Sequence, residues 1–325
     1  MSLLQQDFKT ITVDSSFHQT NLPTLIQPSS NTNWQDCIDE IKQLVDDQLH
    51  HVGGFLFRGF SIEGAEDFND FARAFNHELL NYDYASTPRS EVSGGVYTST
   101  EYPAHQVIPL HNEQAYTSNW PLKIWFHCVT ASEQGGETPI ANSREVYNKI
   151  SPEIRQRLVE RGLMYVRNYG NGLDLPWQNA FGTNDKATVE KFCHDNGISF
   201  IWKDDGELQT KQVCQVIANH PKTNDTVWFN QAHLFHISNL EPNIKETLIS
   251  IVGEENLPRN VYYGDGTPIE DETLQHVRDV LDECQISFPW QPGDIMMLDN
   301  MLTAHGRSSF SGERKVIVAM AEAHS

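Results

Sequence analysis

The sequence predicts a mainly β protein with helical insertions, built on a β-barrel or jelly-roll core with flanking helices. Several short segments after residue 110 are rich in β-branched and aromatic residues, which favour strands. Turn sequences such as Asp204-Asp205-Gly206 and Pro292-Gly293-Asp294 separate them. Amphipathic segments of helical length interrupt this series. Many short strands with long helical insertions are typical of a decorated barrel or jelly roll.

The first third of the chain predicts a helix, a strand, a second helix and a loop. Apolar residues recur at helical spacing over 33–51, with Asn33 as a candidate N-cap, and Gly53-Gly54 ends that helix before the buried strand 55–57. Phe68, Phe71 and Phe75 mark one face of the second helix, and 81–109 predicts a loop. Further strands are predicted at 122–130, 163–169, 198–203, 212–218, 226–230, 294–298 and 314–320, and further helices near 152–161 (with Ser151 as cap), 186–195, 242–254 and 271–284.

We expect one domain over residues 1–325. The chain has 325 residues, of which 38% are hydrophobic, and it shows no repeat, low-complexity tract or linker. Within that domain, residues 1–80 predict a helical and strand elaboration, and the jelly-roll core is expected over about 105–325.

Charge and cysteine usage exclude several partners and compartments. Lys plus Arg is 23 against 44 for Asp plus Glu, a net charge of −21, which disfavours binding to nucleic acid or to anionic membranes. The five cysteines form no CxxC pair, the N-terminus lacks a basic region, and no apolar run is long enough to span a bilayer. We therefore expect a cytoplasmic protein without a signal peptide, while its oligomeric state stays undetermined.

Two histidines and a glutamate form a candidate metal site. If the segment around His111-Asn112-Glu113 is extended, His111 and Glu113 share a face, since side chains alternate along a strand. His305 follows a predicted strand late in the chain, and a barrel can pair early with late strands. Two histidines and one carboxylate form the facial triad that suits non-haem Fe(II). Taken singly, each residue is better explained by an ordinary strand position or by a core histidine.

Two further features predict a carboxylate-binding site nearby. Arg314 alternates onto the same face as Val316 and Val318 in the last strand, where no acidic residue is available to pair with it. A buried guanidinium requires an anion, so a bound carboxylate is a candidate, and a salt bridge from another element is the alternative. The turn Gly135-Gly136-Glu137-Thr138 offers a hydroxyl at Thr138 for the same carboxylate.

These motifs resemble, in order and spacing, the taurine dioxygenase/TfdA-like superfamily of Fe(II)- and 2-oxoglutarate-dependent oxygenases. The similarity begins near GGFLFRGF at residue 53, and LHNEQAY, WFNQAHLFH and LDNMLTAHGR are most similar to the SyrP-like branch. The resemblance implies a double-stranded β-helix core, with His111, Glu113 and His305 as iron ligands. It also implies that Thr138 and Arg314 bind the distal carboxylate of 2-oxoglutarate, with Arg307 as a rival for that role.

The resemblance also implies a reaction and a substrate class. Such enzymes use O₂ and convert 2-oxoglutarate to succinate and CO₂ while oxidising an unactivated C–H bond. A carboxylate ligand, here Glu113, argues against halogenation and for hydroxylation, with desaturation or cyclisation as alternatives. Taurine is a poor candidate, because Val318 replaces the arginine that binds the sulfonate in taurine dioxygenases.

The SyrP-like similarity implies an amino acid or amino-acid-derived substrate in natural-product biosynthesis, either free or tethered to a carrier protein. The acidic surface favours a free substrate, since carrier proteins are usually acidic too. Loop 81–109 is a candidate lid. Two other classes stay open at this point, a Zn²⁺-dependent hydrolase using the same triad and a non-catalytic metal-binding barrel. Candidate substrate-binding residues are Arg89, Arg167, Asn230, Gln231, Tyr262 and Tyr263.

Overall fold

The large β-sheet of the molecule has eight strands, and its order joins the start of the chain to its end. The structure is a computed structural model that describes residues 8–17, 21–30, 33–81, 84, 86–170 and 172–325. The first seven residues, which the signal-peptide prediction concerns, lie outside this set. In spatial order the strands are β1 (Ile11–Asp14), β2 (Thr24–Pro28), β3 (Gly54–Phe57), β16 (Ile295–Asp299), β7 (Trp120–Thr130), β19 (Lys315–His324), β5 (Val96–Thr98) and β4 (Glu91–Ser93). All pairs are antiparallel except β2 with β3.

A smaller sheet faces it and carries the two candidate histidine ligands. Its strands are β6 (Ile108–His111), β17 (Thr303–Arg307) and β9 (Ile140–Asn142), and the pair β8 (Gln134–Gly135) with β18 (Phe310–Ser311) continues beside it. One cavity is lined by Phe126 and Val318 from the large sheet and by His111 and His305 from the small one. The cavity therefore lies between two sheets, as the jelly-roll prediction requires.

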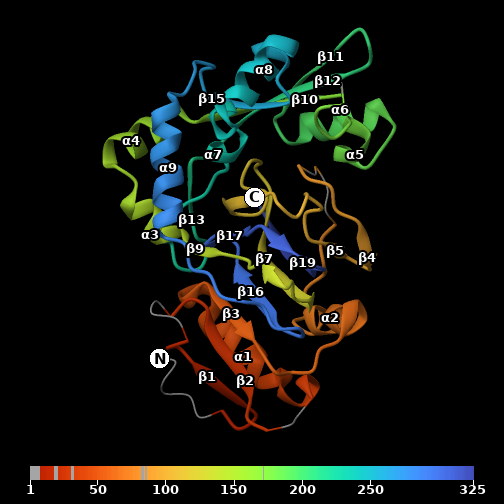
Figure 1. Cartoon of the computed structure of the whole chain (residues 1–325), viewed down its shortest axis with the longest axis vertical. Coiled ribbons are helices and arrows are strands. Elements are labelled where there is room, and N and C mark those ends of the chain that lie inside the picture. The colour runs from red at the N-terminus through yellow and green to blue at the C-terminus, as the bar shows by residue number, and fades with distance from the viewer. Residues whose placement is uncertain (1–7, 18–20, 31–32, 82–83, 85, 171) are drawn as a thin grey trace.

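The N-terminal residues cover the outer face of the large sheet. Helix α1 (Trp34–Val52) and helix α2 (Gly64–Arg73) pack their apolar faces against it, as Figure 1 shows at the bottom of the molecule. Phe57, Phe71 and Trp34 meet edge to face in this layer, with ring centroids about 5.4–5.5 Å apart. This layer buries the face of the sheet that points away from the cavity.

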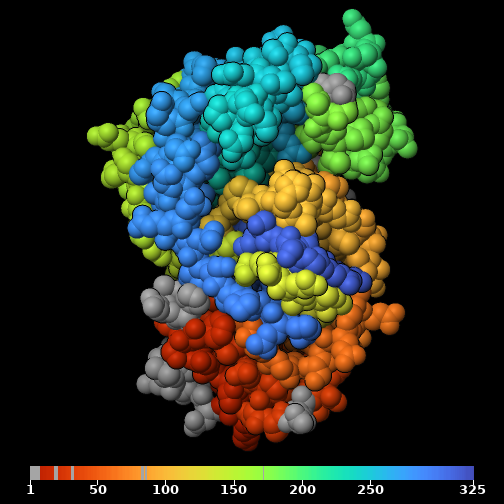
Figure 2. All heavy atoms as spheres, in the orientation of Figure 1, coloured from red at the N-terminus to blue at the C-terminus, as the bar shows by residue number. Residues whose placement is uncertain are grey.

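A long insertion lies over the other end of the core. It contains helices α3 (Ser143–Lys149), α4 (Pro152–Arg161), α5 (Trp177–Phe181), α6 (Lys186–Asp195), α7 (Ala232–Phe235), α8 (Pro242–Val252) and α9 (Asp271–Glu283). Its four-stranded sheet has the order β11 (Ser199–Trp202), β12 (Leu208–Cys214), β10 (Leu163–Tyr169) and β15 (Arg259–Tyr263), and β13 (Ile217–Asn219) pairs with β14 (Thr226–Trp228). Figure 2 shows the insertion and the N-terminal residues at opposite ends of the long axis.

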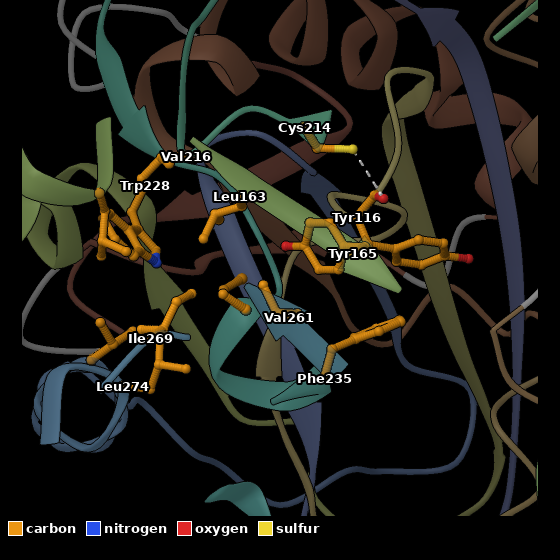
Figure 3. Close-up of a cluster of buried hydrophobic side chains, with 14 of the residues drawn as sticks. Tyr116, Leu163, Tyr165, Cys214, Val216, Trp228, Phe235, Val261, Ile269 and Leu274 are labelled. Atoms are coloured by element: carbon orange, nitrogen blue, oxygen red, sulfur yellow. Dashed lines mark hydrogen bonds between the residues drawn. The ribbon is translucent and has the colours of Figure 1, made fainter. Parts of the chain in front are cut away.

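The insertion has its own apolar cluster, which joins it to the core. Figure 3 shows Tyr165 and Val261 from its sheet packed with Phe235 and with Tyr116, which follows the metal-site strand in sequence. The Cys214 thiol donates to the backbone oxygen of Tyr116 over 3.3 Å. The insertion is therefore packed directly against the segment that carries the candidate site.

Most predicted elements form, and the differences have local causes. Helices α4 and α6 have the predicted bounds, but the predicted strand 212–218 divides after Cys214, and loop 81–109 contains β4, β5 and the first half of β6. The side chains of Asn33 and Ser151 accept no capping hydrogen bond. Short elements such as α3, α5, α7 and β15 were not predicted, because so few residues give no clear periodicity. Among the described residues, no helix is long and apolar enough to cross a membrane.

Candidate metal centre and cosubstrate pocket

Strand pairing brings the two candidate histidines together. In the antiparallel pair of β6 with β17, His305 lies directly opposite His111, and their ring centroids are 4.6 Å apart. A Cβ at Gly306 would lie 2.6 Å from the Ile108 carbonyl oxygen, so only glycine permits this close approach of the strands. The two histidines are distant in sequence but neighbours in the sheet.

The tautomer of His111 leaves a free nitrogen for a metal. Its Nδ1 lies 2.8 Å from the carbonyl oxygen of Pro109, which can only accept, so Nδ1 carries the proton and Nε2 keeps its lone pair. Burial and the neighbouring His305 lower the pKa of His111 to about 3, which keeps the imidazole neutral at pH 7. His305 has a buried Nδ1 with no hydrogen-bond partner.

Glu113 is positioned by a buried asparagine rather than by a strand. Strand β6 ends at His111, and the chain turns sharply after Glu113, since Gln114 has a φ of 55°. The Asn300 side chain accepts from the Glu113 N–H at 2.7 Å and donates to the Glu113 carbonyl oxygen at 3.0 Å. The expectation that His111 and Glu113 share a face of one strand was therefore wrong in its mechanism, because the strand stops before Glu113.

The three side chains form one compact cluster. Their candidate ligand atoms all lie within 4.8 Å of one another, and Glu113 Oε2 is 3.7 Å from His305 Nε2. Glu113 also accepts from the Arg89 guanidinium at 2.7 Å. Burial opposes its charged form, but Arg89 and His305 outweigh this and hold the pKa of Glu113 below its ordinary value. Two histidines and an ionised carboxylate suit Fe(II) as a donor set.

Thr138 lies beside this cluster with its hydroxyl proton available. The hydroxyl oxygen accepts from the Trp290 indole N–H at 3.1 Å, so the proton of Thr138 is free to be donated to an anion. The turn before it needs glycine, because Gly136 has a φ of 74° and a Cβ there would lie 2.2 Å from Ser132 Oγ. The carbonyl oxygen of Gly136 accepts from Arg314 Nε at 2.7 Å.

The guanidinium of Arg314 lines the same cavity and has no carboxylate partner among the described residues. Its remaining nitrogens reach only the hydroxyls of Ser99 at 3.4 Å and Thr138 at 3.5 Å, and no acidic residue in the described ranges forms an ion pair with it. Burial, and next the like charge of Arg307, lower the pKa of Arg314 to about 10. An anionic ligand would relieve both effects, so these residues fit a bound carboxylate.

Arg307 differs from Arg314 because its guanidinium already donates hydrogen bonds to backbone carbonyl oxygens. Its two terminal nitrogens donate to the carbonyl oxygens of Thr100, Tyr102, Pro103 and Gln106 at 2.7–3.3 Å. This arginine therefore holds the preceding loop in place, which favours Arg314 over its rival as the anion-binding group.

The candidate substrate residues are scattered, and only Arg89 lines the metal-site cavity. The side-chain amide of Asn230 donates a hydrogen bond to the carbonyl oxygen of Val216 at 2.8 Å, and that of Gln231 donates to the carbonyl oxygen of Asn112 at 2.7 Å. Gln231 therefore braces the backbone between His111 and Glu113. No contact in the described structure supports a substrate role for these two amides.

The other three candidates lie in the sheet of the insertion. Tyr263 donates to Glu270 at 2.7 Å, and the hydroxyl of Tyr262 lies 3.5 Å from Glu254. Arg167 is 1% exposed, and its guanidinium lies 4.6 Å from the centre of the Tyr169 ring. The two tyrosines contact acidic residues of the insertion, whereas Arg167 also lies over the rings of Tyr84 and Tyr116 outside it. The substrate roles of all three stay predictions.

Sequence reasoning missed Asn300 and Trp290 and read Arg89 as a substrate residue. Asn300 could have been suspected from its position in the sequence, between a predicted strand and the segment with His305. Trp290 gave none, because its contact with Thr138 crosses the fold. At the position of the sulfonate-binding arginine, Val318 lines the cavity with an apolar side chain, as the sequence indicated.

A jelly roll with two histidines, one carboxylate and an adjacent arginine is the arrangement of non-haem iron oxygenases. The family model "Taurine catabolism dioxygenase TauD, TfdA family" matches residues 19–320 of this chain. The chain therefore belongs to the TauD/TfdA family.

Two curated proteins and a solved structure extend the comparison. The dapdiamide synthesis protein DdaC of Enterobacter agglomerans is 42% identical over 276 residues, which cover 85% of this chain and 84% of DdaC. A clavaminate synthase-like protein of Arabidopsis thaliana is 34% identical and covers 86% of this chain and 84% of its own length. PvcB of Pseudomonas aeruginosa shares the fold, with a TM-score of 0.56 at 15% identity over 99% of this chain and 94% of PvcB.

Membership of this family resolves the classes that the sequence left open. The protein is an enzyme, an Fe(II)- and 2-oxoglutarate-dependent oxygenase that uses O₂. The hydrolase and the non-catalytic barrel are set aside by this membership. The fold prediction of a jelly-roll core with flanking helices is confirmed.

Proposed function

We propose that this enzyme oxidises an unactivated C–H bond of an amino acid or amino-acid-derived substrate, by hydroxylation, in natural-product biosynthesis. The observation that carries the proposal is the compact cluster of His111, Glu113 and His305 next to Arg314, for which the described residues provide no carboxylate partner. The similarity to DdaC, whose name places it in dapdiamide synthesis, supports the biosynthetic context. The carboxylate ligand supports hydroxylation over halogenation, and desaturation or cyclisation are the alternatives within the same chemistry.

Each residue has a defined task in this proposal. His111, Glu113 and His305 would hold Fe(II), which supplies O₂ activation coupled to the conversion of 2-oxoglutarate to succinate and CO₂. Arg314 and Thr138 would bind the distal carboxylate of 2-oxoglutarate with a guanidinium and a hydroxyl. Phe126 covers His305, with ring centroids 4.8 Å apart, and excludes water from that side.

The apolar wall at Val318 argues against sulfonates as substrates, despite the name of the family. A sulfonate placed there would lose its water without gaining a cation. We therefore expect no turnover of taurine, and succinate release with one or more amino acids or their derivatives. Of the six candidate substrate residues, Arg89 lines the metal-site cavity, and the substrate roles of the other five stay predictions.

Whether the substrate is free or carrier-tethered is tested by offering both forms. The acidic chain disfavours docking of an acidic carrier, so turnover of the free amino acid is expected. Turnover only of the loaded carrier would overturn this part of the proposal. The cytoplasmic location stays a prediction, to which the five buried, unpaired cysteines are suited.

The first experiment adds Fe(II) and then 2-oxoglutarate to the protein without oxygen. A visible charge-transfer band of the chelated 2-oxo acid is expected in the wild type and is expected to vanish in His305→Ala. An Asn119→Ala variant, which loses two exposed amide contacts with Ser118 and Asn196, is the control and keeps the band. Absence of the band in the wild type, with metal bound, would refute the proposed site.

A further inference from the structure

Arg89 is the cation nearest to the candidate metal ligands, and its neighbour is the ligand itself. Its Nη2 donates to Glu113 Oε2 at 2.7 Å, and both side chains are 4% exposed. The same carboxylate oxygen lies 3.7 Å from His305 Nε2, so the ion pair is formed on the side that faces the cluster. A charge-assisted contact at this distance and burial is strong and directional.

The segment that carries Arg89 is anchored to the core on both sides of it. The carbonyl oxygen of Pro88 accepts from the Glu101 N–H at 3.1 Å, and the backbone of Ser90 both donates to and accepts from Thr98 at 2.9 Å. Arg89 therefore projects from a position that is braced on both sides, while the lid role of loop 81–109 stays a prediction.

Glu113 needs such a contact because the rest of its side chain is not held by the sheet. Asn300 fixes the backbone of Glu113, but three rotatable bonds separate that backbone from the carboxylate. Metal ligands are commonly oriented by a hydrogen bond from outside the coordination sphere. Arg89 supplies this bond to the ligand that is otherwise the least constrained of the three.

We infer that Arg89 is a positioning residue that holds the Glu113 carboxylate toward His111 and His305, rather than the group that binds the substrate. This inference rests on the proposed function, since it takes the cluster to be the metal site. It predicts that Arg89 acts on metal affinity in the absence of any substrate. An arginine reserved for a substrate carboxylate would instead change only the KM for that substrate.

The test is a titration of the metal-free protein with Co²⁺, followed by its d–d absorption, without 2-oxoglutarate or substrate. Arg89→Met is expected to raise the Co²⁺ dissociation constant at least tenfold, and Arg89→Lys to restore part of the loss, because it keeps the charge but not the planar fork. Arg73→Met is the matched control. Arg73 supports the turn after β4 through the Gly94 carbonyl oxygen at 2.7 Å without touching the cluster, and wild-type affinity is expected.

Two outcomes separate the inference from the function on which it rests. Wild-type Co²⁺ affinity in Arg89→Met, with a raised substrate KM, would overturn the positioning role and leave the metal site intact. Failure of the wild type to bind Co²⁺ in a His305-dependent way would instead refute the proposed function. Circular dichroism of each variant confirms folding, and the conservative Arg89→Lys variant keeps the test decisive if Arg89→Met does not fold.

Discussion

Asn300 illustrates how one buried side chain can determine the geometry of a site it does not join. It is 0% exposed, it contacts Glu113 twice, and it also donates to the Pro121 carbonyl oxygen at 2.8 Å. Its own carbonyl oxygen accepts from Asn112 at 2.6 Å. The segments around residues 112 and 300 are therefore locked together at the point where the carboxylate ligand leaves the backbone.

Replacement Asn300→Ala is expected to destabilise the protein by about 3 kcal/mol and to weaken metal binding, because buried backbone groups lose their partners. Urea unfolding and Co²⁺ titration measure the two effects. Asn300→Asp can still accept from the Glu113 N–H but loses both donated bonds, so an intermediate result is expected. Unchanged metal affinity in Asn300→Ala would contradict the role of this clamp.

Arg314→Ala is expected to raise the dissociation constant for 2-oxoglutarate by about 30-fold or more while leaving metal affinity unchanged, since it removes a buried charged contact. Equilibrium titration of the charge-transfer band gives both values. Arg307→Ala tests the rival. It is expected to destabilise the loop before β6 rather than to act on the cosubstrate, and a larger effect on 2-oxoglutarate than that of Arg314→Ala would reverse the assignment.

At the scale of elements, short turns and helices hold the site together. The turn at Gly136 brings its carbonyl oxygen to Arg314, and the segment before α7 brings Gln231 to the metal strand. His233, in α7 itself, donates to the carbonyl oxygen of Leu110 at 2.8 Å. The insertion thus contributes backbone support, although the sequence suggested a substrate role for Asn230 and Gln231.

Gly136→Ala is expected to weaken 2-oxoglutarate binding, because the new methyl group would lie 2.2 Å from Ser132 Oγ and 3.0 Å from Arg314 Cδ. The comparison with Gly182→Ala separates this clash from backbone strain. Gly182 has a φ of 62°, but no atom lies within 4 Å of the position that its new methyl group would take, so this variant should lose stability without losing cosubstrate affinity. Equal 2-oxoglutarate affinity in both variants would count against the turn's role.

Burial lowers the pKa of His233 to about 4 from an ordinary value of 6.5, so the unfolded chain binds a proton between these pH values and the folded chain does not. The free energy of unfolding therefore decreases as the pH falls from about 6.5 to 4, and this residue contributes at most ~1.4 kcal/mol of that decrease per pH unit. His233→Gln keeps a donor for Leu110 without titrating. Urea unfolding at pH 7, 6 and 5 should show a smaller pH slope in the variant.

At the scale of the whole molecule, the site depends on segments from both ends of the chain meeting between two sheets. Strand β3 and the final strand β19 belong to the same large sheet, and His305 pairs with His111 across the small one. Ligands that bind only this assembled state must stabilise the entire fold through mass action.

Metal removal is therefore expected to lower the melting temperature. Adding Fe(II) or Co²⁺ at about 100 times its dissociation constant should stabilise the protein by about 2.7 kcal/mol, with a further gain from 2-oxoglutarate. Chelation by EDTA should reverse the gain. His305→Ala should show neither response, and a metal-dependent shift that persists in this variant would place the metal elsewhere.

The sequence by itself determined the jelly-roll class, the long helices and the identity of the candidate metal-binding residues. These features depend on residues that are close together in the sequence, such as periodic apolar residues, the HNE motif and the segment before His305. It also indicated Arg314 and Thr138, although Arg314 lies just before the last strand and not within it, because β19 begins at Lys315 and its register shifts between Lys315 and Val316. Arg314 still lines the same cavity as Val318.

Only the tertiary structure decided which groups hold those residues in place. The Arg89 contact with Glu113, the Asn300 clamp and the backbone bonds of Arg307 each join segments that are separate in sequence. A single chain carries no periodic signal for such contacts, because they depend on which side chains the two sheets and the insertion bring within hydrogen-bonding distance. For the same reason the sequence misread Gln231, whose amide is satisfied by a backbone oxygen that only folding places beside it.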